Sequence, residues 1–134
     1  MKLSTRSRYG TRILVELAMQ TVEGPVPVSR ISRRQGIPVK YMEQLIRKLK
    51  SAGLIKSVRG ARGGHLLARD AASITLGEIV RLFEGQADLV ECVSSPKYCD
   101  KSADCQARKA WKKATEALFR ELDGLSIADL TCKS

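Results

Sequence analysis

The sequence predicts a mainly α-helical protein with one small β-hairpin, an α+β fold in 134 residues. Apolar residues recur at helical spacing in several separate segments. A single glycine-rich basic stretch, residues 59–64, separates two short segments of β character. Positive charge is also uneven, since residues 1–67 hold 14 Lys and Arg against 3 Asp and Glu, whereas residues 68–134 hold 10 against 11. The first half is therefore expected to meet a polyanion.

Two helices joined by a tight turn are predicted at the start of the chain. The first helix is capped by Ser4 or Thr5, and one face of it is formed by Tyr9, Ile13 and Leu17. The second helix covers residues 29–35 and ends at Gly36, and Pro38 is expected in the first turn of the helix that follows. This order predicts a helix, a turn and a helix.

A third helix is predicted to have two different faces and to end at Gly53. The buried face has the spacing i, i+3, i+4, i+7 and consists of Met42, Leu45, Ile46 and Leu49. The outward face consists of Val39, Lys40, Glu43, Gln44, Arg47 and Lys48. On that face Glu43 could accept a hydrogen bond from cytosine and Gln44 could pair with adenine. Lys40 and Arg47 could hold phosphates or guanine.

Two short strands, residues 54–58 and 65–68, are predicted on either side of a basic glycine-rich tip that contains Arg59 and Arg62. Helix, turn, helix and then a basic hairpin is the order of a winged helix-turn-helix. A helix fits the major groove of DNA, and glycines beside the two arginines allow a close approach to the minor groove. DNA is the expected partner, and a solvated surface is the alternative for both the helix and the hairpin.

The second half of the chain is predicted to hold two more helices with a loop between them. Thr75-x-x-Glu78 is a capping box for a helix that stops near Gly85. Residues 86–104 lose helical periodicity. A long helix from Asp104 is predicted from an apolar stripe formed by Ala107, Trp111, Ala114, Leu118 and Leu122. Trp111 is expected in the core or in a dimer interface.

Three of the four cysteines, Cys92, Cys99 and Cys105, lie close together in the sequence. Thiolates are preferred ligands of iron–sulfur clusters, and three of them on one loop could close around a cluster. Cys105 is expected at the N-terminus of the long helix, where the helix dipole favours a thiolate. The spacing lacks the paired C-x2-C of a zinc ribbon. Structural zinc, a regulatory disulfide and unligated thiols stay open as alternatives.

Several motifs of the chain belong to one known pattern. They are Ile31-Ser32-x-Arg34-Gln35-Gly36-Ile37, Tyr41-x-Glu43-Gln44-Leu45, Leu49-x-x-x-Gly53-Leu54 and Ser57-Val58-Arg59-Gly60-x-x-Gly63-Gly64. The chain thereby resembles the bacterial winged-helix repressor family that includes the iron–sulfur cluster regulator IscR and the nitric-oxide sensor NsrR. The resemblance implies homodimers with paired C-terminal helices. It also implies DNA contacts at Tyr41, Glu43, Gln44 and Arg59.

The resemblance predicts a sequence-specific transcriptional repressor that senses through an iron–sulfur cluster, 2Fe–2S in preference to 4Fe–4S, held by Cys92, Cys99 and Cys105. A homodimer should bind a pseudo-palindromic site on double-stranded DNA. A cluster-free repressor that senses thiol oxidation or a small effector is the alternative. The expected parts are a DNA-binding domain, a cysteine-bearing sensor loop, and a dimerisation helix with a C-terminal tail, at residues 1–85, 86–104 and 104–134.

The sequence departs from the IscR pattern at the expected further ligand of the cluster. IscR-like proteins have a histidine three residues after the last cysteine, whereas this chain has Arg108, which has no lone pair to donate. Arg108 is instead expected to lie beside the cluster and offset its charge. Nitric-oxide sensors of the family use an acidic residue on the first helix of the partner subunit, whereas this chain has Arg6, Arg8 and Arg12 in that region. The remaining candidate ligands are Cys132, Asp104, Asp100 and Glu91, a solvent molecule or small thiol, or a residue from the partner subunit.

Other classes of protein fit the sequence less well. No stretch approaches the length of about 18 apolar residues that spans a membrane, and the first residues lack the apolar core of a secretory signal, so a cytoplasmic protein with no membrane contact is expected. His65, the only histidine, is expected to pack or to contact phosphate. An enzyme would need an acid–base or nucleophile–base pair, which the chain does not offer. An electron-transfer protein would leave the basic first half unexplained.

Overall fold

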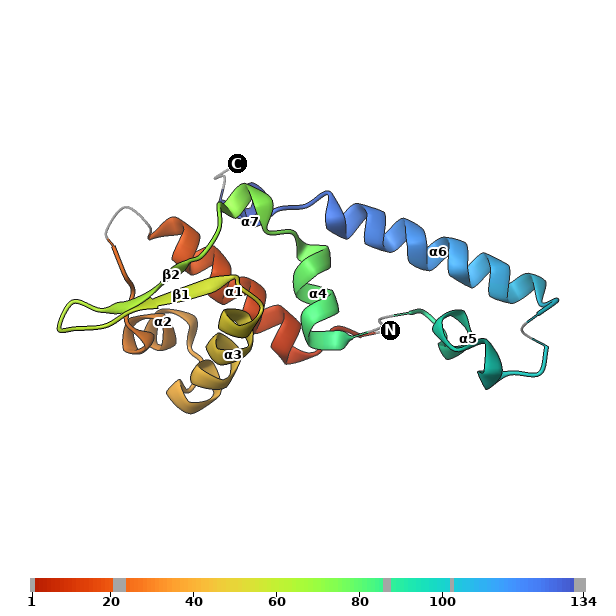
Figure 1. The fold of residues 1–134 in the computed structure, drawn as a ribbon, viewed down its shortest axis with the longest axis horizontal. Helices are drawn as coiled ribbons and strands as arrows, with labels where there is room; N and C mark the ends of the chain where they lie inside the picture. Colours follow the sequence, from red (N-terminus) through yellow and green to blue (C-terminus); the bar gives the residue numbers. More distant parts are fainter. Residues whose placement is uncertain (1, 21–23, 86–87, 102, 132–134) are drawn as a thin grey trace.

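A helix-turn-helix with a projecting hairpin forms one end of the molecule, and a long helix leads away from it to the other end (Figure 1). This computed structural model describes residues 2–20, 24–85, 88–101 and 103–131. Its helices are α1 (Thr5–Met19), α2 (Val28–Gln35), α3 (Val39–Ser51), α4 (Leu76–Glu84), α5 (Glu91–Ser94), α6 (Gln106–Asp123) and α7 (Ile127–Thr131), with 3-10 turns η2 (Ala71–Ser73) and η3 (Pro96–Tyr98). The strands are β1 (Ile55–Val58) and β2 (Gly64–Leu67). The predicted mainly helical fold with one hairpin is confirmed.

The first helix, α1, runs through the centre of the winged unit. Ser4 is its N-cap, and the Ser4 hydroxyl accepts a hydrogen bond from the Ser7 N–H, as predicted. The inner face of α1 is fully buried and includes Ile13, Leu14 and Leu17. Gly10 allows α1 to approach α4, because a Cβ at this position would lie 2.5 Å from the Phe83 ring.

A buried carboxylate joins α1 to α2. Glu16 is 5% exposed, and it accepts hydrogen bonds from Gln20 Nε2 at 2.6 Å and Gln35 Nε2 at 3.1 Å. Arg34 Nε lies 2.6 Å from the same carboxylate. A buried charge is tolerated only when it is paired and hydrogen-bonded, so Arg34 and Gln35 fix the angle between the two helices.

The turn between α2 and α3 depends on Gly36, which has a left-handed conformation with φ +66°. The Ser32 hydroxyl donates to the carbonyl of Ile37 across this turn at 2.5 Å. Pro38 is the N-cap of α3. It therefore lies just before the first turn of the helix, where we expected it, and not within that turn. The predicted buried stripe of α3 is confirmed for Met42, Leu45, Ile46 and Leu49.

The hairpin is antiparallel, with Ile55 opposite Leu67 and Val58 opposite Gly64. Val26 adds a third strand-like contact at its base, since its backbone exchanges hydrogen bonds of 2.9 and 2.8 Å with His65. The backbones come this close because residue 64 is a glycine, where a Cβ would lie 2.5 Å from a backbone atom of Val26. The wing is therefore attached to the segment between α1 and α2.

The C-terminal segment returns to the winged unit. Ile127 of α7 is fully buried in the same core as α1, and its N–H donates to the carbonyl of Ile74 at 2.8 Å. Arg81 of α4 forms a two-bond ion pair with Asp123, at 2.7 and 2.9 Å, at the end of α6. The core of the winged unit thus includes Ile127, which lies well beyond residue 85 in the sequence.

Within residues 86–104, where we expected a loop, the described residues include the short helical turns α5 and η3. The long helix α6 starts at Gln106 and ends before Gly124, close to the prediction. Its predicted apolar stripe is largely uncovered in the protomer, where Trp111 is 47% exposed and Ala107 and Ala114 are exposed too. Trp111 is therefore not a core residue of the protomer. Within the described ranges, the helices lack the length and hydrophobicity needed to cross a membrane.

Candidate DNA interface and cysteine segment

The outward face of α3 carries four of the predicted DNA-contacting side chains in one stripe. All four are exposed and have the spacing i, i+3, i+4, i+7: Lys40, Glu43, Gln44 and Arg47. Three of the four side chains are cationic or amide groups that can donate hydrogen bonds. The stripe therefore presents a mainly basic, hydrogen-bonding surface on a helix, an element that a major groove admits.

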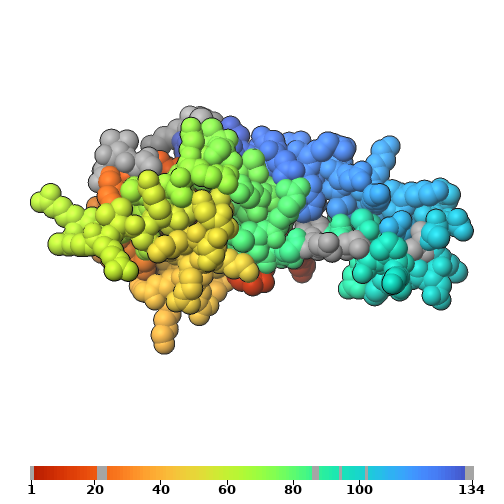
Figure 2. All heavy atoms as spheres, viewed as in Figure 1, coloured from red at the N-terminus to blue at the C-terminus, as the bar shows by residue number. Residues whose placement is uncertain are grey.

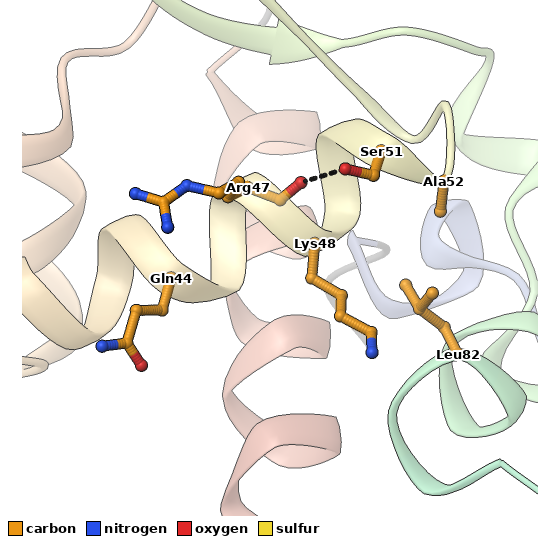
Figure 3. A pocket seen from close by; sticks show the side chains of 6 residues that line it. All are labelled: Gln44, Arg47, Lys48, Ser51, Ala52 and Leu82. Carbon is orange, nitrogen blue, oxygen red and sulfur yellow. Dashed lines mark hydrogen bonds between the residues drawn. The ribbon is translucent and has the colours of Figure 1, made fainter.

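A hollow of about 460 Å³ lies beside this stripe, between α3 and α4. Gln44 and Lys48 extend from the same side of α3, and Lys48 points toward Leu82 of α4 (Figure 3). The Ser51 hydroxyl donates to the carbonyl of Arg47 at 3.0 Å and holds the last turn of the helix. Its lining includes the cationic Arg47 and Lys48 and the apolar Ala52 and Leu82.

Tyr41 differs from its neighbours on α3, because it is half-buried against α1. Its hydroxyl lies 3.1 Å from Thr5 Oγ1, and its ring meets Tyr9 edge-on with 6.0 Å between ring centres. The guanidinium groups of Arg8 and Arg12 lie 5.9 and 5.4 Å from the Tyr9 ring centre. Tyr41 thus fixes the start of α3 relative to α1, close to the side chains of Arg8 and Arg12.

The wing presents Arg59 and Arg62, which are both exposed. Gly60 has φ +116°, and its carbonyl accepts a hydrogen bond from the Gly63 N–H at 3.0 Å, which closes the tip. The hairpin projects from one end of the molecule (Figure 2, yellow-green). A tight glycine turn therefore carries two arginines away from the body of the protein.

His65 is half-buried at the base of the wing, and its Nδ1 lies 3.0 Å from the Ser57 hydroxyl. Burial, and then the charge of Lys50, lower the pKa of His65 below its usual value of 6.5. It borders a hollow of about 240 Å³ between the wing and α3 that Arg47 and Lys50 also line. His65 belongs to the basic face and not to the cysteine segment.

The cysteine segment, residues 88–105 as far as they are described, lies at the end of the molecule opposite the wing (Figure 1). Cys92 on α5 is half-buried, Cys99 is exposed, and Cys105 is the half-buried N-cap of α6. The Cys105 sulfur accepts a hydrogen bond from the Arg108 N–H at 3.4 Å, as expected for a thiol at a helix N-terminus.

The donor chemistry of this segment suits an iron–sulfur cluster, but its geometry is not that of an assembled site. Among the described residues, no three His, Cys, Asp or Glu side chains come close enough to hold a metal ion. Asp100, Asp104 and Cys105 border one hollow of about 420 Å³. The candidate ligand Cys132 lies outside the described residues.

Arg108 joins the two cysteine-bearing helices. Its Nε donates to the carbonyl of Cys92 at 2.7 Å, and a terminal nitrogen donates to the carbonyl of Val93 at 3.4 Å. The side chain that we expected beside a cluster therefore binds backbone here and ties α5 to α6. A guanidinium carries five N–H donors in a planar fork, so this one side chain can donate to both carbonyls.

The sequence did not predict the contact of Glu84 with Ser4 and Ser7 at the start of α1. Glu84 Oε1 accepts hydrogen bonds from the Ser4 N–H at 2.9 Å, the Ser4 hydroxyl at 2.5 Å and the Ser7 hydroxyl at 2.6 Å. These hydrogen bonds, first those of the serine hydroxyls, lower the pKa of Glu84. The partners are about 80 residues apart in the sequence, so no local signal announces the contact. The end of α4, where the cysteine segment departs, is thereby attached to the start of α1.

Comparison with known proteins identifies the family. Residues 3–133 match the family model Rrf2, described as an iron-dependent transcriptional regulator. The chain is 46% identical over 130 residues to the protein rrf2 of Nitratidesulfovibrio vulgaris, covering 97% of this chain and 87% of that one.

Two solved structures carry the same fold. CymR, the global cysteine regulator of B. subtilis, matches with a TM-score of 0.82 and 35% identity over 98% of this chain and 96% of that chain. IscR of T. potens matches with a TM-score of 0.79 and 36% identity over 97% and 85%. These winged-helix proteins are regulators and not enzymes. The chain belongs to the Rrf2 family of DNA-binding transcriptional regulators.

Proposed function

We propose that this protein is a cytoplasmic repressor that binds a pseudo-palindromic DNA site as a homodimer and senses through an iron–sulfur cluster on its cysteine segment. The observation that supports it best is the combination of an exposed basic stripe on α3 and an arginine-tipped wing with three cysteines at the other end of the same chain. The DNA-reading and sensing parts are thus separate in space and connected through α1 and α4.

In this proposal the stripe of α3 enters the major groove and the wing reaches the adjacent minor groove. Arg59→Ala should weaken binding to a specific site by about 1 to 3 kcal/mol, since one arginine contact with DNA is lost. Glu43→Ala should mainly relax the choice of sequence. Fluorescence anisotropy with duplexes selected from random DNA measures both effects, with Lys109→Ala on α6 as the control. Unchanged affinity and unchanged selectivity in both variants would contradict this docking.

Three cysteines, Cys92, Cys99 and Cys105, are the proposed protein ligands of the cluster, with Asp104 or Cys132 as candidates for a further ligand. The described cysteines are not grouped, so the segment would have to close for all three to bind. When bound, the cluster would supply a centre that reacts with oxidants and nitric oxide. Arg108 would keep α5 beside α6 and limit how far Cys92 has to move.

The signal would reach the DNA-binding face through contacts of α1. Glu84, the last residue of α4, accepts hydrogen bonds from Ser4 and Ser7, and Thr5, the residue after Ser4, contacts Tyr41 of α3. A change in the segment that pulls on the end of α4 would therefore move the start of α1 and with it the recognition helix. Sensing requires that the cluster discriminate between two such arrangements.

Anaerobic purification tests the cluster. The wild-type protein should be coloured, with visible absorbance and with iron and acid-labile sulfide in stoichiometric amounts, and Cys92→Ala should lose all three. Cys132→Ala is the informative comparison, since loss of absorbance there would identify it as the further ligand. A colourless, iron-free wild-type protein after anaerobic reconstitution would overturn the cluster assignment.

A cluster-free thiol sensor is the second candidate. It is favoured by the exposure of Cys99 and by the structural likeness to the global cysteine regulator of B. subtilis. In that case a thiol oxidant should change the DNA affinity of iron-free protein, and Cys99→Ser should abolish the change. Retained sensitivity in Cys99→Ser would argue against a role for this thiol.

A further inference from the structure

We infer that the ion pair between Arg81 of α4 and Asp123 of α6, packed on Gly77, is a clamp that sets the direction in which α6 leaves the winged unit. In a dimer that pairs through α6, this direction determines how far apart the two DNA-binding faces lie. Arg81 and Asp123 are thus positioning residues that select the spacing between the two half-sites in the DNA. This inference rests on the proposed function of a dimeric DNA-binding protein and extends it.

The backbone attaches the end of α6 to the start of α4 at one place. The Ile127 N–H donates to the carbonyl of Ile74 at 2.8 Å, and the Leu76 N–H donates to the carbonyl of Leu125 at 2.9 Å, around one antiparallel bridge. Figure 1 shows α6 running from this place toward the opposite end of the molecule. A short bridge fixes where the helix ends, but the residues at the end of an element can act as a hinge. A second contact is therefore needed to fix the direction of α6.

The ion pair between Arg81 and Asp123 supplies this second contact. Two parallel bonds join the side chains, from Nη1 to Oδ1 at 2.7 Å and from Nη2 to Oδ2 at 2.9 Å. A two-bond pair of this kind is planar and fixes orientation as well as distance. The same guanidinium lies over the Phe119 ring, one turn earlier on α6, with 4.5 Å between Cζ and the ring centre. Arg81 therefore contacts two successive turns of α6.

Gly77 makes room for the ion pair. It is a buried residue of α4, and a Cβ at this position would collide with the carboxylate of Asp123. Glycine is less favourable than alanine inside a helix, so the contact with Asp123 gives a physical reason for a glycine here. Because residue 77 has no side chain, α6 can bring its carboxylate close to α4 and to the Arg81 guanidinium.

Asp123 does not serve α6 itself. It is the last residue of the helix, where the negative end of the helix dipole disfavours a carboxylate. The side chains of Arg81 and Asp123 are 50% and 44% exposed, so their pair adds little to the free energy of unfolding. The hydrogen bonds from Arg81 lower the pKa of Asp123, which keeps its carboxylate charged. The pair therefore contributes geometry more than stability.

A small change of direction at the clamp becomes a large displacement further along α6. Trp111, in the exposed apolar stripe, precedes Asp123 by twelve residues, which corresponds to about 18 Å along a helix axis. A rotation of about 10° at the clamp would move Trp111 by about 3 Å relative to the winged unit, close to the rise of about 3.4 Å per base pair. Since both protomers contribute, the clamp can change the preferred spacing by about one or two base pairs.

Duplexes with different spacers test the inference. Two half-sites from a duplex that the wild type selects from random DNA are placed at the selected spacing, and then closer together and farther apart in steps of one base pair. The wild type should prefer one spacing by about tenfold or more, because a rigid dimer cannot place both heads at the others. Asp123→Ala and Gly77→Ala should reduce this preference to about threefold or less, or move it to another spacing. Anisotropy titrations measure the affinities.

Glu78→Ala is the matched control. Glu78 forms a two-bond ion pair on the same helix, with Arg69 at 2.8 and 2.7 Å, that does not involve α6. This variant should keep the spacing preference of the wild type. All variants should also keep the affinity for a single half-site within about twofold, since the clamp does not touch the DNA-binding face. Circular dichroism and sedimentation equilibrium verify that each variant is folded and dimeric, and Asp123→Ala carries the test if Gly77→Ala does not fold.

The outcomes separate this inference from the proposed function. A wild type that is monomeric or binds no DNA would remove the proposed function itself. A dimeric, DNA-binding wild type without a spacing preference, or with one that Asp123→Ala leaves unchanged, would overturn this inference alone. An equal loss of preference in Glu78→Ala would overturn it too, because any weakening of α4 would then have the same effect. A monomeric Asp123→Ala would assign the pair to assembly and not to direction, which also contradicts the inference.

Discussion

Gly64 decides whether the wing can attach to the rest of the DNA-binding unit. A side chain at this position would meet backbone atoms of Val26 and Pro27 at 2.5 to 2.8 Å, and backbone cannot move aside as a flexible side chain can. Gly64→Ala should therefore lower the free energy of unfolding by about 1 to 3 kcal/mol. It should also weaken DNA binding, because the wing loses its support.

Urea denaturation measures the effect of Gly64→Ala, and Ala61→Ser at the exposed hairpin tip is the control. The control should change stability by less than about 0.5 kcal/mol. If Gly64→Ala has the same urea midpoint of unfolding as the wild type, the close approach of Val26 to the wing does not constrain the fold.

His65 makes the stability of the fold depend on pH in a defined window. Its pKa in the folded protein is lower than the usual 6.5, because the half-buried ring loses solvation and lies near Lys50. Above pH 6.5 the imidazole is neutral in both states. As the pH falls below 6.5, the unfolded chain binds a proton that the folded chain refuses, so stability decreases until the folded pKa is reached.

Thermal unfolding between pH 7.5 and pH 5 tests this expectation. His65 is the only histidine, so His65→Gln should remove the decrease that begins near pH 6.5. The carboxylates whose pKa is lowered, such as Glu84, titrate at more acidic pH and do not interfere. An equally steep decrease in His65→Gln would assign the effect to other groups.

At the scale of elements, the contact between the end of α4 and the start of α1 is the proposed connection between sensing and DNA binding. Glu84→Gln keeps the shape of the side chain but removes the charge that three hydrogen bonds stabilise. We expect the ratio of DNA affinities between the cluster-bound and cluster-free protein to move toward one, because the two elements are coupled less strongly.

Glu78→Gln is the matched control for Glu84→Gln. It removes a carboxylate from the same helix, and the ion pair that it loses, with Arg69 at 2.7 Å, does not involve α1. Anisotropy titrations of both variants, with and without cluster, supply the ratios. If Glu84→Gln has the same ratio of DNA affinities as the wild type, the contact between Glu84 and α1 does not connect sensing to DNA binding.

At the scale of the whole molecule, α6 has an apolar stripe that a single chain leaves exposed. Trp111, 47% exposed, is its largest member. Trp111→Glu should convert the proposed dimer to a monomer, since a charge would have to be buried in the interface that this stripe would form. Binding to a two-half-site operator should then fall by at least about tenfold, because two tethered heads bind more tightly than one.

Sedimentation equilibrium measures the oligomeric state of Trp111→Glu. Lys113→Glu, a charge reversal of an exposed residue two positions further along α6, is the control and should leave the assembly unchanged if the stripe alone forms the interface. A Trp111→Glu variant that remains dimeric would move the interface to another surface.

Local patterns were sufficient to predict most elements of the winged unit. The two faces of α3, the caps at Ser4 and Thr75, and the turn at Gly36 follow from side chains within one or two turns of the chain. The reciprocal bonds between Ser126 and Asp129 at α7 were likewise predictable. The turns α5 and η3 were not, because segments of three or four residues are too short to show a helical period.

Sequence by itself determined the fold class, the basic first half, the outward stripe of α3 and the segment that carries three cysteines, because each depends on residues close together in the chain. Only the tertiary structure decided which distant groups meet. It brought Glu84 to Ser4, Arg108 to the carbonyl of Cys92, and α7 into the core of α1. It also brought two arginines of α2 opposite the wing. Such contacts arise from the packing of elements against one another, and no local spacing records them.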